Sequence, residues 1–160
     1  MGMIPAINSS AVVIDANFLI VLCAKEPDTF ALAREQMKFY GDNGYQPYAP
    51  GVLVAEVLFA LCRKLSEGSL TPTEHNQAVT SLNIYLQTIA PPPSGDTALT
   101  LRAEAIRGTY GCSRSADGLY IALAEELAHS VPTELVTFDV ALAKQVQEVA
   151  PTVKVVLLAL

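Results

Sequence analysis

The stretch Ala11-Val12-Val13-Ile14-Asp15-Ala16-Asn17 decides how the rest of the chain is interpreted. Four apolar residues, three of them β-branched, run directly into an aspartate. Such a run is typical of a short strand buried on both faces. The pattern returns near the other end of the chain as Leu135-Val136-Thr137-Phe138-Asp139. Because the carboxyl ends of parallel strands meet at one edge of a sheet, the two aspartates are predicted to share a site there.

Length and composition favour one folded domain. The 160 residues are enough to bury a core, and a hydrophobic content of 51% excludes a disordered chain. No apolar run is long enough to span a membrane, and residues 1–10 carry no basic residue that would mark a secretion signal. We therefore expect a flexible leader over residues 1–10 and a single domain over residues 11–160, with no membrane association.

Charge and cysteine usage narrow the class further. The net charge of −6 argues against a protein that coats duplex nucleic acid, because such proteins are normally basic. It leaves room for an enzyme that grips a nucleic acid through a local basic patch, and an acidic surface attracts basic partners. Cys23, Cys62 and Cys112 have no paired spacing, so we interpret them as reduced core thiols of a cytoplasmic protein.

Helical patterns alternate with short buried strands along the chain. Thr71-Pro72-Thr73-Glu74 has the spacing of a capping box, and Pro91-Pro92-Pro93-Ser94-Gly95 is a strong break. This alternation predicts a three-layer α/β fold with a central, mainly parallel sheet and right-handed crossovers. The expected strands cover residues 11–14, 47–49, 135–137 and 153–158, and the expected helices cover residues 18–24, 28–40, 51–66, 72–86, 96–109, 116–128 and 140–149.

Glu56 is the most informative single residue, because apolar residues surround it in the sequence Val52-Leu53-Val54-Ala55-Glu56-Val57-Leu58-Phe59-Ala60-Leu61. A buried, ionised carboxylate without a partner costs several kcal/mol, so something must compensate it. One explanation is an arginine partner or the dipole at the start of its helix. The other explanation is a functional site.

Three aspartates also have plain structural explanations when taken singly. Asp117 lies in the first turn of a helix, and Asp15 and Asp139 stand where helix N-caps are common. Together with Glu56, however, all of them lie at strand ends or helix starts, which point to one edge of a parallel sheet. Carboxylates crowded there repel one another, and a divalent cation removes the conflict. Oxygen ligands without Cys or His suit Mg²⁺ or Mn²⁺, and such an ion supports phosphoryl transfer or hydrolysis.

At these residues the sequence resembles the PIN-domain nucleases and, within them, the VapC-type toxins. The resemblance runs in order from about residue 11 to residue 157, and each of its motifs is short. The matching pieces are Val13-Ile14-Asp15-Ala16-Asn17, Glu56, Ser115-Ala116-Asp117-Gly118-Leu119-Tyr120-Ile121-Ala122-Leu123-Ala124 and Leu135-Val136-Thr137-Phe138-Asp139.

The resemblance implies an α/β/α sandwich and a Mg²⁺- or Mn²⁺-dependent endoribonuclease that cleaves single-stranded RNA. It implies that Asp15, Glu56, Asp117 and Asp139 form the catalytic and metal-binding cluster. It further implies a homodimer and, for a toxin, a small antitoxin protein as partner. Asn17 and Thr137 match small polar positions that support the acids.

Two features need comment beside this resemblance. Gly118 stands where alanine is more usual, and we expect this difference to matter little. RNA must approach an acidic protein, so we propose Arg102, Arg107 and Arg114 as phosphate contacts, although ordinary solvated charges explain them equally well. Tyr110 and Tyr120 either stack on bases or pack in the core and its rim.

Other functions stay open at this point. A haloacid-dehalogenase-like phosphatase also has a first strand that ends in aspartate, but its second acid would fall at position 17, which is Asn here. A non-toxin PIN-like nuclease and a silent PIN-like interaction module share the fold, but a silent module should have lost acids. A receiver-like domain would need a strand-borne lysine, which we do not find in the expected place.

Overall fold

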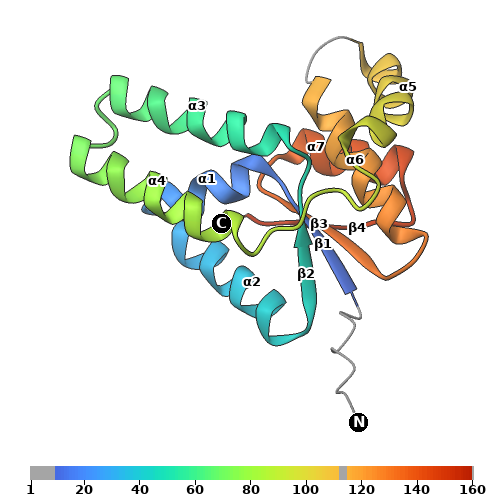
Figure 1. The fold of residues 1–160 in the computed structure, drawn as a ribbon, viewed down its shortest axis with the longest axis horizontal. Helices are drawn as coiled ribbons and strands as arrows, with labels where there is room; N and C mark the ends of the chain where they lie inside the picture. Colours follow the sequence, from blue (N-terminus) through green and yellow to red (C-terminus); the bar gives the residue numbers. More distant parts are fainter. Residues whose placement is uncertain (1–9, 112–114, 160) are drawn as a thin grey trace.

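The structure, a computed structural model, describes residues 10–111 and 115–159. In this part of the chain four strands form one parallel sheet in the order β2-β1-β3-β4 (Figure 1). Strands β1 (Ser10–Ile14) and β3 (Thr133–Thr137) are the central pair, with β2 (Tyr45–Tyr48) and β4 (Lys154–Leu157) at the edges. All of β3 and all of β1 except Ser10 are buried, as predicted for strands covered on both faces.

Helices cover the two faces of this sheet. The group α1 to α4 lies on one side and α5 to α7 on the other (Figure 1), which confirms the predicted three-layer α/β/α architecture. None of the helices in the described ranges is long and apolar enough to cross a membrane. The helices are α1 (Ala16–Ala24), α2 (Phe30–Asp42), α3 (Val52–Ser66), α4 (Pro72–Leu86), α5 (Thr100–Tyr110), α6 (Ser115–Ala128) and α7 (Val140–Val149), with a 3-10 turn η1 (Asp96–Leu99) before α5.

Local sequence signals place most element ends correctly. The capping box is present: Thr71 Oγ1 accepts from the Glu74 backbone N–H at 3.1 Å, and Glu74 Oε1 accepts from the Thr71 N–H at 2.9 Å. Several boundaries differ from expectation; β2, for example, covers Tyr45–Tyr48 and not residues 47–49. Strand β1 already begins at Ser10, which we had assigned to the leader. The expected helix 96–109 is divided into η1 and α5, and Asp96 accepts from the distant Gly51 N–H at 2.9 Å.

The cysteine prediction holds for only one of the two described thiols. Cys23 is buried, and burial raises the pKa of its thiol to about 12. Cys62 is exposed, so its interpretation as a core thiol was wrong. The reason is that α3 packs on α1 and α4 and leaves its other side open, where Phe59 is 66% exposed. Cys112 lies outside the described residues.

Candidate active site

Asp15 is held at the carboxyl end of β1 by the neighbouring strand. The register pairs Ile14 with Val136, so the next positions, Asp15 and Thr137, lie level with each other. Thr137 Oγ1 donates a hydrogen bond of 2.7 Å to Asp15 Oδ2, and both side chains are buried. The Asp15 side chain makes no capping bond to α1. Its alternative interpretation as a side-chain N-cap is therefore not supported.

Asp139 reaches the same edge from the end of β3. Its backbone N–H donates to Thr137 Oγ1 at 2.9 Å, so the Thr137 hydroxyl lies between Asp15 and Asp139. Asp139 Oδ1 also accepts from the N–H groups of Ala141 at 2.8 Å and Leu142 at 3.1 Å. Asp139 is thus the N-cap of α7, as its structural explanation predicted, and the cap orients the carboxylate at the edge of the sheet.

The pKa of Asp15 responds to burial and to the charges of two other aspartates. The pKa of Asp15 rises from 3.8 to about 7, chiefly because burial disfavours the charged form. The Thr137 hydrogen bond opposes this rise, whereas the negative charges of Asp117 and Asp139 add to it. Asp117 lies in the first turn of α6, which packs on β1 and β3. Carboxylates from three separate segments of the chain thus influence one another electrostatically.

Glu56 is hydrogen-bonded to a tyrosine of α6, the helix that also carries Asp117. Tyr120 is buried on α6, and its hydroxyl donates to Glu56 Oε1 at 2.7 Å. Burial and the hydrogen bond to Glu56 raise the pKa of Tyr120, and the charges of Glu56, Asp15 and Asp117 raise it further. No lysine or arginine in the described ranges forms an ion pair with Glu56, so the arginine explanation gains no support.

Glu56 is nevertheless less enclosed than its sequence suggested. The side chain is half-buried, and its neighbours Val54, Leu58 and Phe59 are exposed. The expectation of apolar packing all round the helix was wrong, because α3 has neighbours on one side. Tyr120 itself belongs to the core, as its packing interpretation predicted. No pattern in the sequence predicts the hydrogen bond between Tyr120 and Glu56.

The donor set at this edge fits a hard divalent cation. The side chains that meet here offer oxygen atoms from carboxylates and hydroxyls, without histidine or cysteine, and Asp15 is disfavoured as a bare anion. In residues 10–111 and 115–159 no group of three or more His, Cys, Asp or Glu side chains is arranged to hold a metal ion. Mg²⁺ typically binds one or two carboxylates and keeps several waters. The cluster fits that mode, and the four-acid ligand set stays a prediction.

The two predicted supporting residues differ in what they do. Thr137 bridges Asp15 and Asp139 as described above. Asn17 lies in the first turn of α1 with an exposed side chain, and it makes no hydrogen bond to the acids within the described ranges. A supporting role for Asn17 stays a prediction without a contact behind it.

Replacing Thr137 with valine is expected to lower the free energy of unfolding by about 1–3 kcal/mol, because two hydrogen bonds are lost while the shape is kept. The pKa of Asp15 should also rise further, since the Thr137 hydroxyl lowers it. Urea unfolding of the variant measures the first effect. Thr137→Ser keeps the hydroxyl and serves as the control, and equal destabilisation by both variants would contradict this role.

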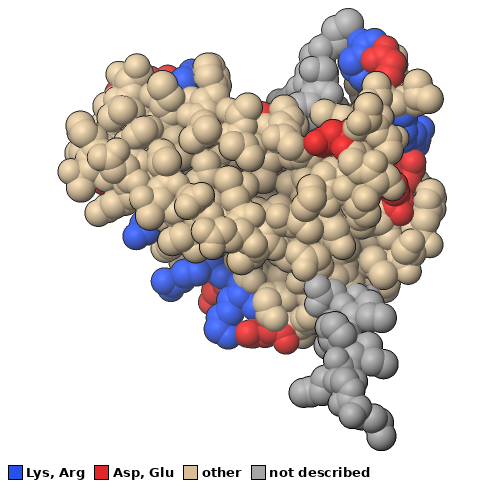
Figure 2. Space-filling view, viewed as in Figure 1, with Lys and Arg blue, Asp and Glu red and all other residues tan. Residues whose placement is uncertain are grey.

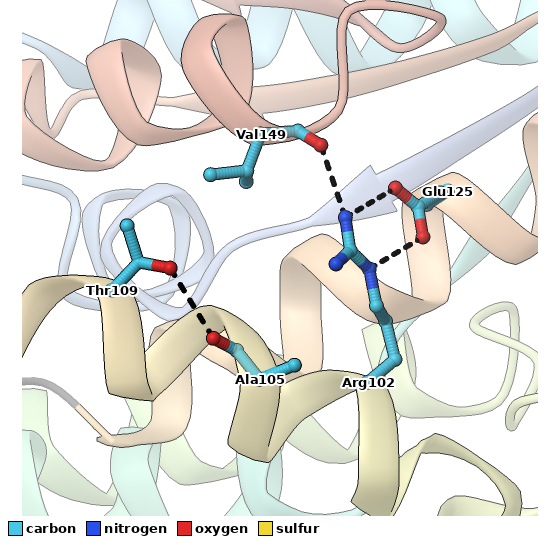
Figure 3. Close-up of polar contacts among 5 residues, drawn as sticks. All are labelled: Arg102, Ala105, Thr109, Glu125 and Val149. Atoms are coloured by element: carbon cyan, nitrogen blue, oxygen red, sulfur yellow. Dashed lines mark hydrogen bonds and ion pairs between the residues drawn. The ribbon is translucent and has the colours of Figure 1, made fainter.

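The arginines proposed as phosphate contacts have other partners. Arg102 donates to both carboxylate oxygens of Glu125, at 2.8 and 2.9 Å, and to the backbone oxygen of Val149 at 3.1 Å (Figure 3). It thereby joins α5 to α6 and to the end of α7. Arg107 pairs with Glu104 one turn away on α5. Both groups are engaged within the protein, and Arg114 lies outside the described residues.

The face of the molecule in Figure 2 has no broad positive surface. Lys and Arg side chains gather over α2 and α5, and acidic side chains stand beside them. The view agrees with the net charge of −6. Contacts to a polyanion on this face would thus depend on rearranged ion pairs.

Gly118 contradicts the expectation that it matters little. A Cβ atom at this position would lie 2.7 Å from the backbone oxygen of Ala103, a distance that requires some part of the structure to move. Gly118 therefore allows α6 to approach α5 closely.

The comparisons with solved structures agree with the fold. The chain shares its fold with VapBC2 from Rickettsia felis, solved bound to a promoter DNA fragment, at a TM-score of 0.60 and 14% identity over 91% of this chain and 97% of that one. FitAcB from Neisseria gonorrhoeae aligns at 0.56 and 17% identity over 90% and 95%. FitAB bound to an IR36 DNA fragment aligns at 0.57 and 16% over 91% and 93%. No curated protein sequence matches the chain.

A family model supplies the assignment that these distant similarities do not. The model of the PIN domain matches residues 12–147, which include all four acids, Asp15, Glu56, Asp117 and Asp139. The match covers most of the chain and runs from β1 to α7. Because the family model matches residues 12–147, this chain belongs to the PIN domain family, a family of nucleases.

Proposed function

We propose that this protein is a metal-dependent endoribonuclease that cleaves single-stranded RNA and acts in the cytoplasm as the toxin of a type II toxin–antitoxin pair. The observation that carries the proposal is the buried Asp15, whose pKa the charges of Asp117 and Asp139 help to raise to about 7. Such a cluster is costly for a folded protein unless a cation neutralises it. Family membership supports hydrolysis of a nucleic acid as its purpose.

We assign each acid a role in the proposed reaction. Asp15, Asp117 and Asp139 would hold Mg²⁺ or Mn²⁺, and the effect of the other two charges on Asp15 supports this assignment. When bound, the ion supplies a Lewis acid that lowers the pKa of water and offsets charge on a phosphoryl oxygen. Glu56 is half-buried, and we propose that it completes the metal shell or positions the attacking water. Thr137 keeps Asp15 and Asp139 in a fixed relation.

The toxin role and its partners rest on the structural neighbours. These neighbours are the assemblies VapBC2 and FitAB, and on this basis we propose an antitoxin protein as partner of this chain. The exposed apolar side chains of α3, Val54, Leu58 and Phe59, offer a surface for a protein partner or for a homodimer. A net charge of −6 favours a partner that is locally basic.

Asp117→Asn is expected to reduce cleavage of a single-stranded RNA in Mg²⁺ by about a hundredfold, a loss of roughly 2.7 kcal/mol in transition-state stabilisation. Chelation of divalent ions should have a similar effect on the wild type. The measurement is single-turnover cleavage of a labelled RNA, with a labelled single-stranded DNA and a phosphate monoester as alternative substrates. Asp42→Asn, at the exposed end of α2, is the control. Full activity of Asp117→Asn, or activity on the monoester alone, would refute the proposal.

A further inference from the structure

Tyr120 occupies an unusual position for a core residue. It follows Asp117 by three residues on α6, so both lie on the same face of that helix. The side chain is 1% exposed, and its hydroxyl ends 2.7 Å from Glu56 Oε1. The contact joins two helices that otherwise pack on different neighbours, because α3 packs on α1 and α4 whereas α6 packs on α5, β1 and β3.

We propose that Tyr120 is a positioning residue that acts on Glu56, an inference that rests on the proposed nuclease function. A glutamate side chain has three torsions, and Glu56 is only half-buried on α3. The Tyr120 hydroxyl donates to one carboxylate oxygen, which fixes the rotation of the carboxylate. The second oxygen, Oε2, is then also held in one orientation.

A purely structural role makes a different prediction. A buried tyrosine needs a hydrogen-bond partner for its hydroxyl, and a glutamate can serve that need alone. The chain contains such a pair elsewhere: Tyr40 is fully buried, and its hydroxyl donates to the buried Glu134 Oε1 at 3.1 Å. Glu134 is the second residue of β3, whereas the aspartates lie beyond the other end of that strand. Tyr40→Phe is therefore a matched control for Tyr120→Phe.

The first test is a double-mutant cycle on RNA cleavage. Tyr120→Phe should lower kcat by about 10- to 100-fold with little change in KM for RNA, as expected for loss of a group that orients a catalytic side chain. In a Glu56→Ala background the same substitution should have no further effect on kcat. Tyr40→Phe should retain wild-type kcat. An equal loss in both backgrounds, or an unchanged kcat in Tyr120→Phe, would overturn the inference.

A second variant and a second measurement guard against a folding artefact. Glu56→Asp keeps the charge but shortens the side chain by one methylene, which takes the carboxylate out of reach of the Tyr120 hydroxyl. It should lose kcat as Tyr120→Phe does, and wild-type kcat in this variant would overturn the inference. Calorimetric titration with Mn²⁺ should show about tenfold weaker binding in Tyr120→Phe but not in Tyr40→Phe.

The Mn²⁺ titration also separates this inference from the proposed function. The wild type could bind Mn²⁺ without cutting RNA. If Tyr120→Phe still lowers the affinity for Mn²⁺ in that case, the positioning role stands and the ribonuclease proposal fails. If the wild type cuts RNA and Tyr120→Phe matches it in both cleavage and Mn²⁺ affinity, Tyr120 is a core residue only.

Discussion

Asp15→Asn is expected to abolish RNA cleavage and, at the same time, to stabilise the protein above pH 7. Loss of the carboxylate should reduce the cleavage rate by about a thousandfold or more, because roughly 4 kcal/mol of transition-state stabilisation is lost with the cation it helps to hold. The gain in stability has a separate origin. Asn is neutral at every pH, whereas the buried Asp15 must ionise against the charges of Asp117 and Asp139.

The sign of the pH dependence follows from the direction of the shift. The pKa of Asp15 rises from 3.8 to about 7 on folding, so the folded protein holds the proton more tightly than the unfolded chain. The stability associated with this group is therefore complete below about pH 4, falls between pH 4 and pH 7, and is lost above pH 7. The span corresponds to at most about 4 kcal/mol in the free energy of unfolding.

Urea unfolding from pH 4.5 to 8.5 measures this effect without added metal. The advantage of Asp15→Asn over the wild type should be small at pH 4.5 and largest at pH 8.5. Added Mn²⁺ should then stabilise the wild type but not the variant. A constant difference between the two proteins across this range would show that Asp15 does not titrate on folding, and the electrostatic account of the site would fail.

Gly118→Ala is expected to lower the free energy of unfolding by about 2–3 kcal/mol. Alanine is the better helix former by about 0.5–1 kcal/mol, but its Cβ would lie 2.7 Å from the Ala103 backbone oxygen and would force α5 and α6 apart. Backbone cannot rotate away as a flexible side chain can. A shift of Tm by roughly 5–10 °C is expected for a chain of this size.

Thermal unfolding measures the change, and α5 contains a matched control. Gly108 is also helical, but a Cβ there would meet nothing within 4 Å. Gly108→Ala should therefore stabilise the protein by about 0.5–1 kcal/mol through helix propensity alone. If both alanine variants are equally stable, the close contact between α5 and α6 is not a constraint. Because Asp117 precedes Gly118, Gly118→Ala should also reduce cleavage where the protein is still folded.

The sequence by itself indicated most of the elements and the two aspartates that follow the central strands. The apolar runs that end in Asp15 and Asp139 contain β-branched residues, and this composition specifies buried parallel strands. Parallel strands place their carboxyl ends at one edge of the sheet. The capping box at Thr71 marked the start of α4 for the same local reason. These signals are readable because strand burial and helix capping involve residues close together in the chain.

Only the tertiary structure decided which side chains are joined across layers. Tyr120 and Glu56 are 64 residues apart, and their hydrogen bond depends on how α6 sits relative to α3. The packing of α5 on α6 also decides whether Arg102 binds Glu125 or a phosphate. The same packing decides whether residue 118 has room for a methyl group. Such contacts arise from distances between whole helices, and these distances leave no periodic pattern in the sequence.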